Sequence, residues 1–95
     1  MELRCRVKLN NCLRKYRKGR GLKQAEVAAI LGLKSTSMIS RWEKGVCLPD
    51  TVNALKLAIL YRTMVDGLFI DHVRQLRYDL YKREEMILTK INKQN

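Results

Sequence analysis

Residues 24–43 read QAEVAAILGLKSTSMISRWE, and this segment carries the strongest structural signal in the chain. Its first eight residues have apolar side chains at helical spacing, which predicts a short amphipathic helix. Gly32 follows, and a glycine can take the positive φ that an abrupt helix exit requires. A second helix is predicted over about residues 36–44, with Ile39 and Trp42 facing inward. The pattern therefore indicates two short helices joined by a tight turn.

The outer face of the second predicted helix carries small hydroxyl residues and cations. The residues on this face are Thr36, Ser37, Ser40, Arg41 and Lys44. A hydroxyl at position 35, 36 or 37 is suited to cap the helix, because its oxygen can accept a backbone N–H. A helix that presents such hydrogen-bonding side chains to solvent is suited to the major groove of DNA.

This pattern and its flanks resemble the helix-turn-helix domain shared by phage Cro and repressor proteins and many small bacterial regulators. Residues 14–24, RKYRKGRGLKQ, are similar to the first helix of that family and its link to the second. RWEKG at residues 41–45, followed by Pro49, is similar to the end of the recognition helix and its following loop. The resemblance covers residues 10–69 and implies an all-α, five-helix lambda-repressor-like DNA-binding domain.

One departure from the family pattern lies just before the recognition helix. The family usually places its buried aliphatic residue one position closer to the turn glycine than here, where Ile39 lies seven residues after Gly32. An extra residue therefore falls within residues 34–37, at the front of the helix expected to read DNA.

Further helices are predicted on both sides of the two-helix unit. One is expected over about residues 9–18, and its inward residues are Leu9, Leu13 and Tyr16. Asp50 is placed as the N-cap of another helix, and Thr63 or Asp66 begins the next. The helix after Asp50 is expected to bury apolar residues spaced three or four apart: Val52, Leu55, Ala58 and Ile59. The predicted organisation is a basic N-terminal arm at 1–9, the DNA-binding domain at 10–69 and a C-terminal helix at 70–95.

The C-terminal segment predicts a long helix outside the minimal family unit. Its apolar stripe consists of Val73, Leu76, Leu80, Ile87 and Ile91. Arg83 and Glu84 interrupt the heptads, which argues against a long two-stranded coiled coil. Two interpretations remain open. Either the stripe contributes to a dimer interface, or the helix folds back and buries the stripe against its own domain.

Charge is distributed unevenly along the chain, whose net charge is +11. Residues 1–48 carry 12 Lys/Arg against 3 Asp/Glu, a net charge of +9, whereas residues 49–95 carry 8 against 6, a net charge of +2. One strongly basic half indicates a polyanionic partner, and it favours nucleic acid over a merely solubilising surface. The sequence shows neither a transmembrane run nor a signal peptide, so we expect a cytoplasmic protein that does not bind membranes.

The three cysteines argue against a metal site and against a disulfide framework. Cys5, Cys12 and Cys47 form no CxxC pair, and the single histidine, His72, is far from them in sequence. A nucleophilic Cys47–His72 pair would lack an orienting carboxylate and an oxyanion site. The sequence therefore predicts no metal, no cofactor and no catalytic residue.

The resemblance also assigns roles to individual residues. In the family, an arginine of the first helix pairs with the acidic residue that ends the recognition helix, and Arg17 and Glu43 occupy these positions. The expected base contacts are Thr36, Ser37, Ser40 and Arg41, with Arg41 foremost because its guanidinium can donate two hydrogen bonds to guanine. The expected phosphate contacts are Lys23, Gln24, Lys34, Lys44 and Asn53. Trp42 is predicted to lie in the core rather than to stack on bases.

These features predict a sequence-specific transcription regulator of double-stranded DNA. We expect a repressor that acts as a homodimer on a two-fold symmetric operator. The alternative is an antitoxin-type protein that binds DNA and also binds a partner protein through its C-terminal helix. An enzyme is not expected, because the sequence has no clustered carboxylates or metal-ligand set.

Overall fold

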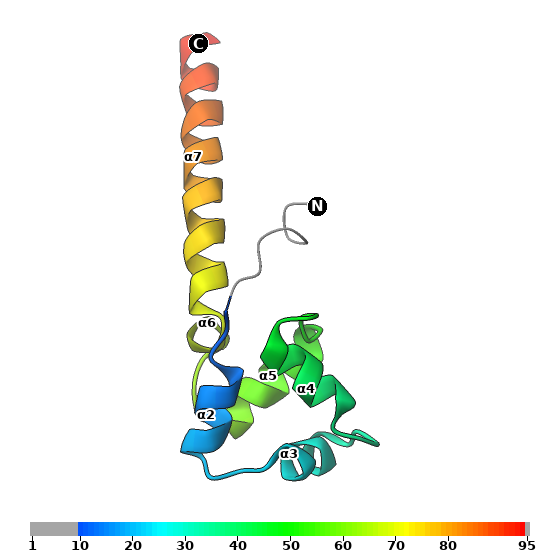
Figure 1. The fold of residues 1–95 in the computed structure, drawn as a ribbon. Helices are drawn as coiled ribbons and strands as arrows, with labels where there is room; N and C mark the ends of the chain where they lie inside the picture. The colour runs from blue at the N-terminus through cyan, green and yellow to red at the C-terminus, as the bar shows by residue number, and fades with distance from the viewer. Residues whose placement is uncertain (1–9, 95) are drawn as a thin grey trace.

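The computed structural model describes residues 10–94, which form six helices and no strand (Figure 1). The helices are α2 (Leu13–Gly19), α3 (Gln24–Leu31), α4 (Ser37–Lys44), α5 (Thr51–Leu60), α6 (Val65–Leu68) and α7 (Ile70–Gln94). The all-α prediction is confirmed. The predicted basic arm, which includes Cys5, lies outside the described residues. In this part of the chain, every helix is too short or too polar to cross a membrane.

Glycines and a carboxylate define several helix ends where the sequence predicted them. Gly32 ends α3 with φ 81°, and Gly45 ends α4 with φ 76°. A side chain in this left-handed region would be strained, whereas glycine is not. At the start of α5, the Asp50 carboxylate accepts the backbone N–H of Asn53 at 2.8 Å, so the predicted N-cap is confirmed.

The first helix starts later than predicted, after a turn that Asn11 stabilises just before the N-cap residue Cys12. The Asn11 side-chain oxygen accepts the N–H of Leu13 at 3.0 Å, and α2 begins at Leu13 rather than near residue 9. The Asn11 side-chain amide also donates to the carbonyl oxygen of Trp42 at 2.9 Å. Asn11 therefore starts α2 and joins it to α4. Leu9, predicted to face inward, lies outside the described residues.

The extra residue before α4 is absorbed by the turn. Residues 34–36 form bends, and α4 begins at Ser37, one residue later than predicted. Thr36 occupies the N-cap position, but its hydroxyl accepts no backbone N–H. Instead the Ser35 hydroxyl accepts the N–H of Ser37 at 3.3 Å. Thr36 thus belongs to the turn, and the helix after it keeps a regular face.

The core lies among α2 to α6. Its buried hydrophobic residues are Leu13, Val27, Ala28, Leu31, Ile39, Trp42, Leu57, Ala58, Tyr61, Leu68 and Phe69. The Trp42 side chain is 3% exposed, which confirms its predicted place in the core and leaves it no surface for base stacking.

The prediction of which face of α5 points inward is wrong. The exposed residues are Val52 at 61%, Leu55 at 51% and Ile59 at 74%, and of the four predicted residues only Ala58 is buried. The helix instead buries Leu57 and Ala58, and Tyr61 directly after it. The sequence of α5, TVNALKLAIL, is apolar almost all round, so the three-to-four spacing fits two faces equally well. Packing against α6 selects one of them.

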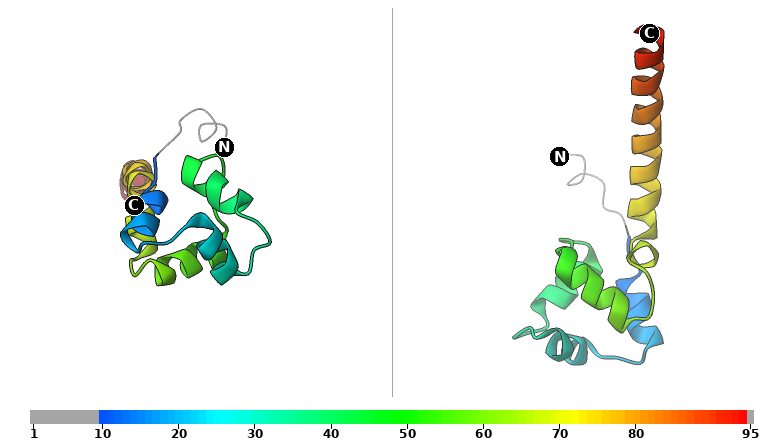
Figure 2. Two further views of the ribbon diagram at one scale, coloured as in Figure 1. Left: turned by 60° about the horizontal axis from the view of Figure 1, so that its bottom comes forward. Right: turned by 180° about the vertical axis from the view of Figure 1, so that it is seen from behind.

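α7 projects away from the other helices, as Figures 1 and 2 show from three directions. Every residue from Arg74 to Ile91 is exposed. The radius of gyration is 17.0 Å, compared with about 12 Å for a compact chain of this length. The fold-back interpretation is therefore wrong for this structure, because the apolar stripe of α7 does not lie against its own domain.

Candidate nucleic-acid interface

α4 presents one polar, cationic face directly opposite its buried residues. At 3.6 residues per turn, Ser37, Ser40, Arg41 and Lys44 fall within roughly a 100° sector of the helix. Ser37, Arg41 and Lys44 are exposed, and Ser40 is half-buried. The opposite side carries the buried anchors of the helix, Ile39 and Trp42. The polar face is thus presented to solvent by a helix whose rotation is set by the core.

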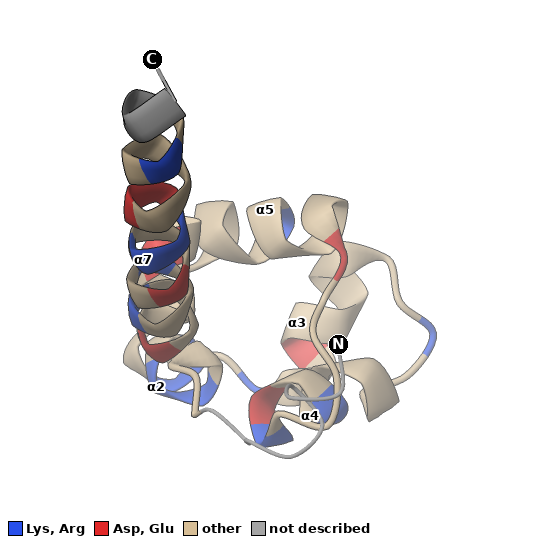
Figure 3. Cartoon of the chain, turned by 90° about the horizontal axis from the view of Figure 1, so that it is seen from above, with Lys and Arg blue, Asp and Glu red and all other residues tan. Residues whose placement is uncertain are grey.

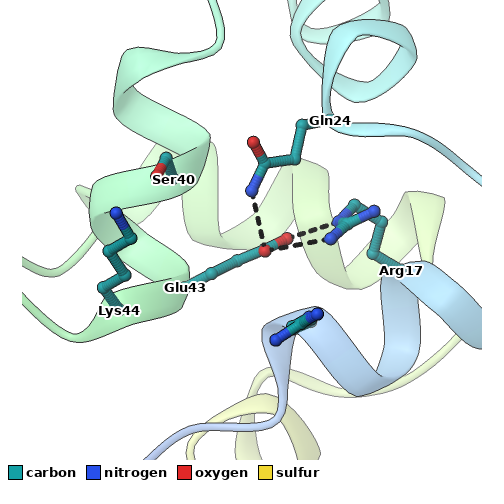
Figure 4. Close-up of a pocket in the computed structure, with 6 residues that line it drawn as sticks. Arg17, Gln24, Ser40, Glu43 and Lys44 are labelled. Carbon is teal, nitrogen blue, oxygen red and sulfur yellow. Dashed lines mark hydrogen bonds and ion pairs between the residues drawn. The ribbon is translucent and has the colours of Figure 1, made fainter.

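A buried ion pair between Arg17 and Glu43 holds α4 against α2. The Arg17 Nε donates to Glu43 Oε2 at 2.6 Å, and Nη2 donates to Oε1 at 3.2 Å. The remaining guanidinium nitrogen donates to the carbonyl oxygen of Leu22 at 2.9 Å. The two side chains are only 10% and 6% exposed. Gln24 at the start of α3 also donates to Glu43 Oε1, at 3.0 Å (Figure 4). One carboxylate on α4 is therefore held from two other helices.

The Arg17–Glu43 pair determines the charge state of the groups that lie behind the polar face of α4. The hydrogen bond to Glu43 raises the pKa of Arg17 against the opposing effect of its burial, so the guanidinium stays charged. Burial raises the pKa of Tyr61 to about 12, and the negative charge of Glu43 adds to this effect. Neither group changes its charge near neutral pH. Because Arg17 neutralises Glu43, the acidic end of α4 does not repel an approaching phosphate.

An open hollow of about 260 Å³ lies beside the ion pair (Figure 4). Its lining residues are Arg14, Arg17, Gln24, Ser40, Glu43 and Lys44. The only carboxylate in this lining is engaged by Arg17, so the remaining charges are the exposed cations Arg14 and Lys44. Such a lining can receive an anionic oxygen through charge and hydrogen bonds together. The sequence did not predict Arg14 as a DNA contact, although its position three residues before Arg17 on α2 places it on the same helix face.

The other predicted phosphate contacts lie outside this hollow. Lys23 and Lys34 are exposed before and after α3, and Asn53 is half-buried in the first turn of α5. Of the predicted contacts, the structure thus gathers Gln24, Ser40 and Lys44 at the hollow, whereas Lys23, Lys34 and Asn53 do not line it. Figure 3 shows cationic segments on both α2 and α4.

The described residues contain no group of three or more His, Cys, Asp or Glu side chains arranged to hold a metal ion. Cys12 and Cys47 are half-buried thiols that form no disulfide. His72 lies in α7, edge-on to the ring of Phe69 at a centroid distance of 5.6 Å.

The family model HTH_3, described as helix-turn-helix, matches residues 13–66. This span begins with the first residue of α2, contains α3, α4 and α5, and ends within α6, so it includes the whole interface described above. Searches of curated proteins and of solved structures returned no match. The matched span exceeds half of the chain, and the chain belongs to the Cro/repressor-type helix-turn-helix family of DNA-binding transcription regulators.

Proposed function

We propose that this regulator recognises a specific duplex sequence by placing α4 in the major groove. The observation that carries the proposal is the hydrogen-bonding face of α4, which lies opposite two buried anchors. A major groove is about 12 Å wide and admits one α-helix. The Arg17–Glu43 pair supports this reading, because a helix held from two sides presents its face in one orientation.

Each polar residue of this surface receives a role in the proposal. Arg41 reads a base, and a guanine is favoured because its O6 and N7 accept both donors of a guanidinium. Shorter side chains at the front of α4 read neighbouring base edges or a thymine methyl: Thr36, Ser37 and Ser40. Phosphates of the DNA backbone are bound by Lys23, Gln24, Lys34, Lys44 and Asn53. Arg14 joins this group, because it lines the same hollow as Gln24 and Lys44.

We also propose that the protein is a repressor that acts as a homodimer on a two-fold symmetric operator. A single helix-turn-helix reads few base pairs, too few for specific occupancy against genomic competitors. Two units on half-sites one helical turn apart remove this limit. A dimer bound across an operator excludes other proteins from the same DNA, which is sufficient for repression.

A second candidate is an antitoxin-type protein that binds both DNA and a partner protein. The exposed apolar stripe of α7 favours it, because a partner protein would cover such a surface. The two candidates differ in what α7 binds, a second copy of this chain or another protein. The mass of the purified protein in solution distinguishes them, since only the first candidate forms a dimer unaided.

The test of DNA recognition is selection of bound duplexes from a random pool by the full chain. We expect a motif with two related half-sites one helical turn apart. Arg41→Ala should change the base preference at one position, whereas the control Lys56→Ala, on exposed α5 surface, should leave the motif unchanged. Recovery of a random pool, together with binding that does not weaken between roughly 50 and 200 mM salt, would contradict DNA recognition.

A further inference from the structure

The exposed face of α7 carries two charges within an otherwise apolar seam. In heptad register the a positions are Ile70, Arg77, Glu84 and Ile91, and the d positions are Val73, Leu80 and Ile87. Most of the apolar members are well exposed, with Leu80 at 60%, Ile87 at 51% and Ile91 at 47%. The seam is therefore suited to pack against another helix, provided that its two charges find partners there.

Neither charge has an opposite charge within reach on its own helix. The residues three or four positions from Arg77 are Val73, Arg74, Leu80 and Tyr81, and those from Glu84 are Leu80, Tyr81, Ile87 and Leu88. Over the described part of the chain, the single ion pair within 4.0 Å joins Arg17 and Glu43. Asp79, by contrast, lies outside the seam and accepts a hydrogen bond from Gln75 one turn away.

The order of residues along this face reads alike from either end. From the N-terminal side the seam runs Ile70, Val73, Arg77 and Leu80, and from the C-terminal side it runs Ile91, Ile87, Glu84 and Leu80. From either end the third residue of the seam is the charged one and the fourth is Leu80. A two-fold axis near Leu80 therefore brings each Arg77 within one helical turn of the partner's Glu84 and sets apolar residues of the seam beside apolar ones.

The charges also discriminate between the two possible orientations of paired helices. In a parallel pair, a positions face a positions, so Arg77 meets the partner's Arg77 and Glu84 meets the partner's Glu84. Like charges set against each other in an apolar seam are destabilising. In an antiparallel pair about the axis above, each Arg77 lies within one helical turn of the partner's Glu84. Opposite charges then meet at both places.

We propose that two copies of this chain associate through an antiparallel pair of α7 helices, with each Arg77 beside the partner's Glu84. This deepens the proposed homodimer and rests on that part of the proposed function. The arrangement places the two DNA-binding domains at opposite ends of the pair. The two Ile70 residues are then about 30 Å apart along the helix axes, at 1.5 Å per residue.

The first experiment is a charge exchange, read as the dimer dissociation constant by sedimentation equilibrium. Arg77→Glu and Glu84→Arg should each weaken the dimer about tenfold or more, because each variant replaces two attractive pairs by two repulsive ones. The double variant restores opposite charges only in the antiparallel arrangement, so it should return to within about threefold of the original protein. A double variant as weak as the single ones would overturn the proposal.

Controls separate charge pairing from unfolding and from net charge. Lys82→Glu makes the same charge change as Arg77→Glu on the side of α7 away from the seam, and it should leave the dissociation constant within about twofold. Helicity by circular dichroism and the fluorescence of buried Trp42 should be the same in all variants, because the altered side chains are exposed. An equal weakening by Lys82→Glu would mean that net charge, not the seam, controls association.

The second experiment measures orientation directly with a nitroxide amino acid at position 90. Antiparallel pairing predicts a distance of about 25–30 Å between the two labels along the helix axes, whereas parallel pairing predicts about 10 Å. A short distance overturns the proposal, and so does a protein that stays monomeric at high concentration.

Failure of this pairing and failure of DNA recognition give different results. A monomer that still selects one duplex sequence overturns the α7 pairing and leaves DNA recognition standing. An antiparallel dimer without duplex selectivity does the opposite.

Discussion

Two arginine–glutamate combinations in this chain have different surroundings. Arg17 and Glu43 are 26 positions apart in sequence, yet the fold brings them to 2.6 Å and buries both. Arg77 and Glu84 are seven positions apart on one helix, yet they are exposed and make no ion pair with each other. The first combination is completed by tertiary packing within one chain. The second, in our proposal, is completed only by a second chain.

The difference shows that burial changes the free-energy cost of leaving one of these charges unpaired. A buried charge that loses its partner is left in a poorly solvated site, so the pair becomes essential once it is enclosed. An exposed charge keeps its water and costs little on its own. We therefore expect substitutions at the first combination to affect folding, and substitutions at the second to affect association.

The largest effect is expected from Arg17→Met. It leaves Glu43 buried without its main partner, and the free energy of unfolding should fall by about 3–5 kcal/mol. The double variant Arg17→Met/Glu43→Leu should recover most of this loss, because no unpaired charge remains. Urea unfolding followed by Trp42 fluorescence measures both. Equal losses in the single and double variants would show that shape rather than charge matters at this site.

A smaller effect on folding, but a large one on association, is expected when the exposed seam becomes acidic. Leu80→Asp/Ile87→Asp should weaken the dimer by about two orders of magnitude, since four charges enter an apolar contact. Ultracentrifugation should find a monomer, and circular dichroism should find the helices retained. A dimer of unchanged affinity would exclude α7 as the interface. An unfolded chain would show that α7 packs against its own domain, contrary to the structure.

On the DNA side, base reading and backbone binding should separate. Arg41→Ala should cost about 1–3 kcal/mol on the selected duplex and relax one base position. Lys44→Ala should weaken all duplexes alike and lower the slope of log K against log salt by about one. Titrations of matched and scrambled duplexes at several salt concentrations measure both. If both variants weaken every duplex equally, Arg41 binds the backbone.

The smallest effect is expected in the pH dependence of stability, through His72 in the first turn of α7. Burial lowers the pKa of His72, although neighbouring Asp71 acts in the opposite direction. The folded state therefore binds this proton less readily than the unfolded state does. The stability contribution is complete above about pH 6.5 and declines as the pH falls below that value toward the pKa of the folded state. Thermal unfolding from pH 5 to 7.5 should show a shallower dependence for His72→Gln. An identical profile would contradict the assignment.

Much of the fold was predictable because its signals are local. The extent of α3 follows from a run of eight helix-forming residues that ends before Gly32, and the end of α4 follows from Gly45. The cap of α5 depends on Asp50 and a backbone N–H three residues later. The start of α2 was missed because Asn11 acts across the gap to α4 as well as within its own turn.

The candidate site was predictable in its residue types and less so in its geometry. The polar face of α4 follows from helical periodicity, since 3.6 residues per turn place Ser37, Arg41 and Lys44 together. Helical periodicity does not predict the hollow that Arg14 and Lys44 line, because the hollow depends on the distance between α2 and α4. The match to the family covers α3 and α4 but leaves the role of each side chain a prediction.

Short runs of this sequence determined the ends of α3 and α4, the N-cap of α5 and the polar face of α4, because capping and periodicity act over a few residues. Which face of α5 is buried was decided by packing, because its residues are apolar on two faces and only contact with α6 distinguishes them. The same holds for α7. Its apolar seam is visible in the sequence, but only the tertiary structure shows that residues 10–69 leave this seam uncovered, since none of their helices reaches beyond the first turn of α7.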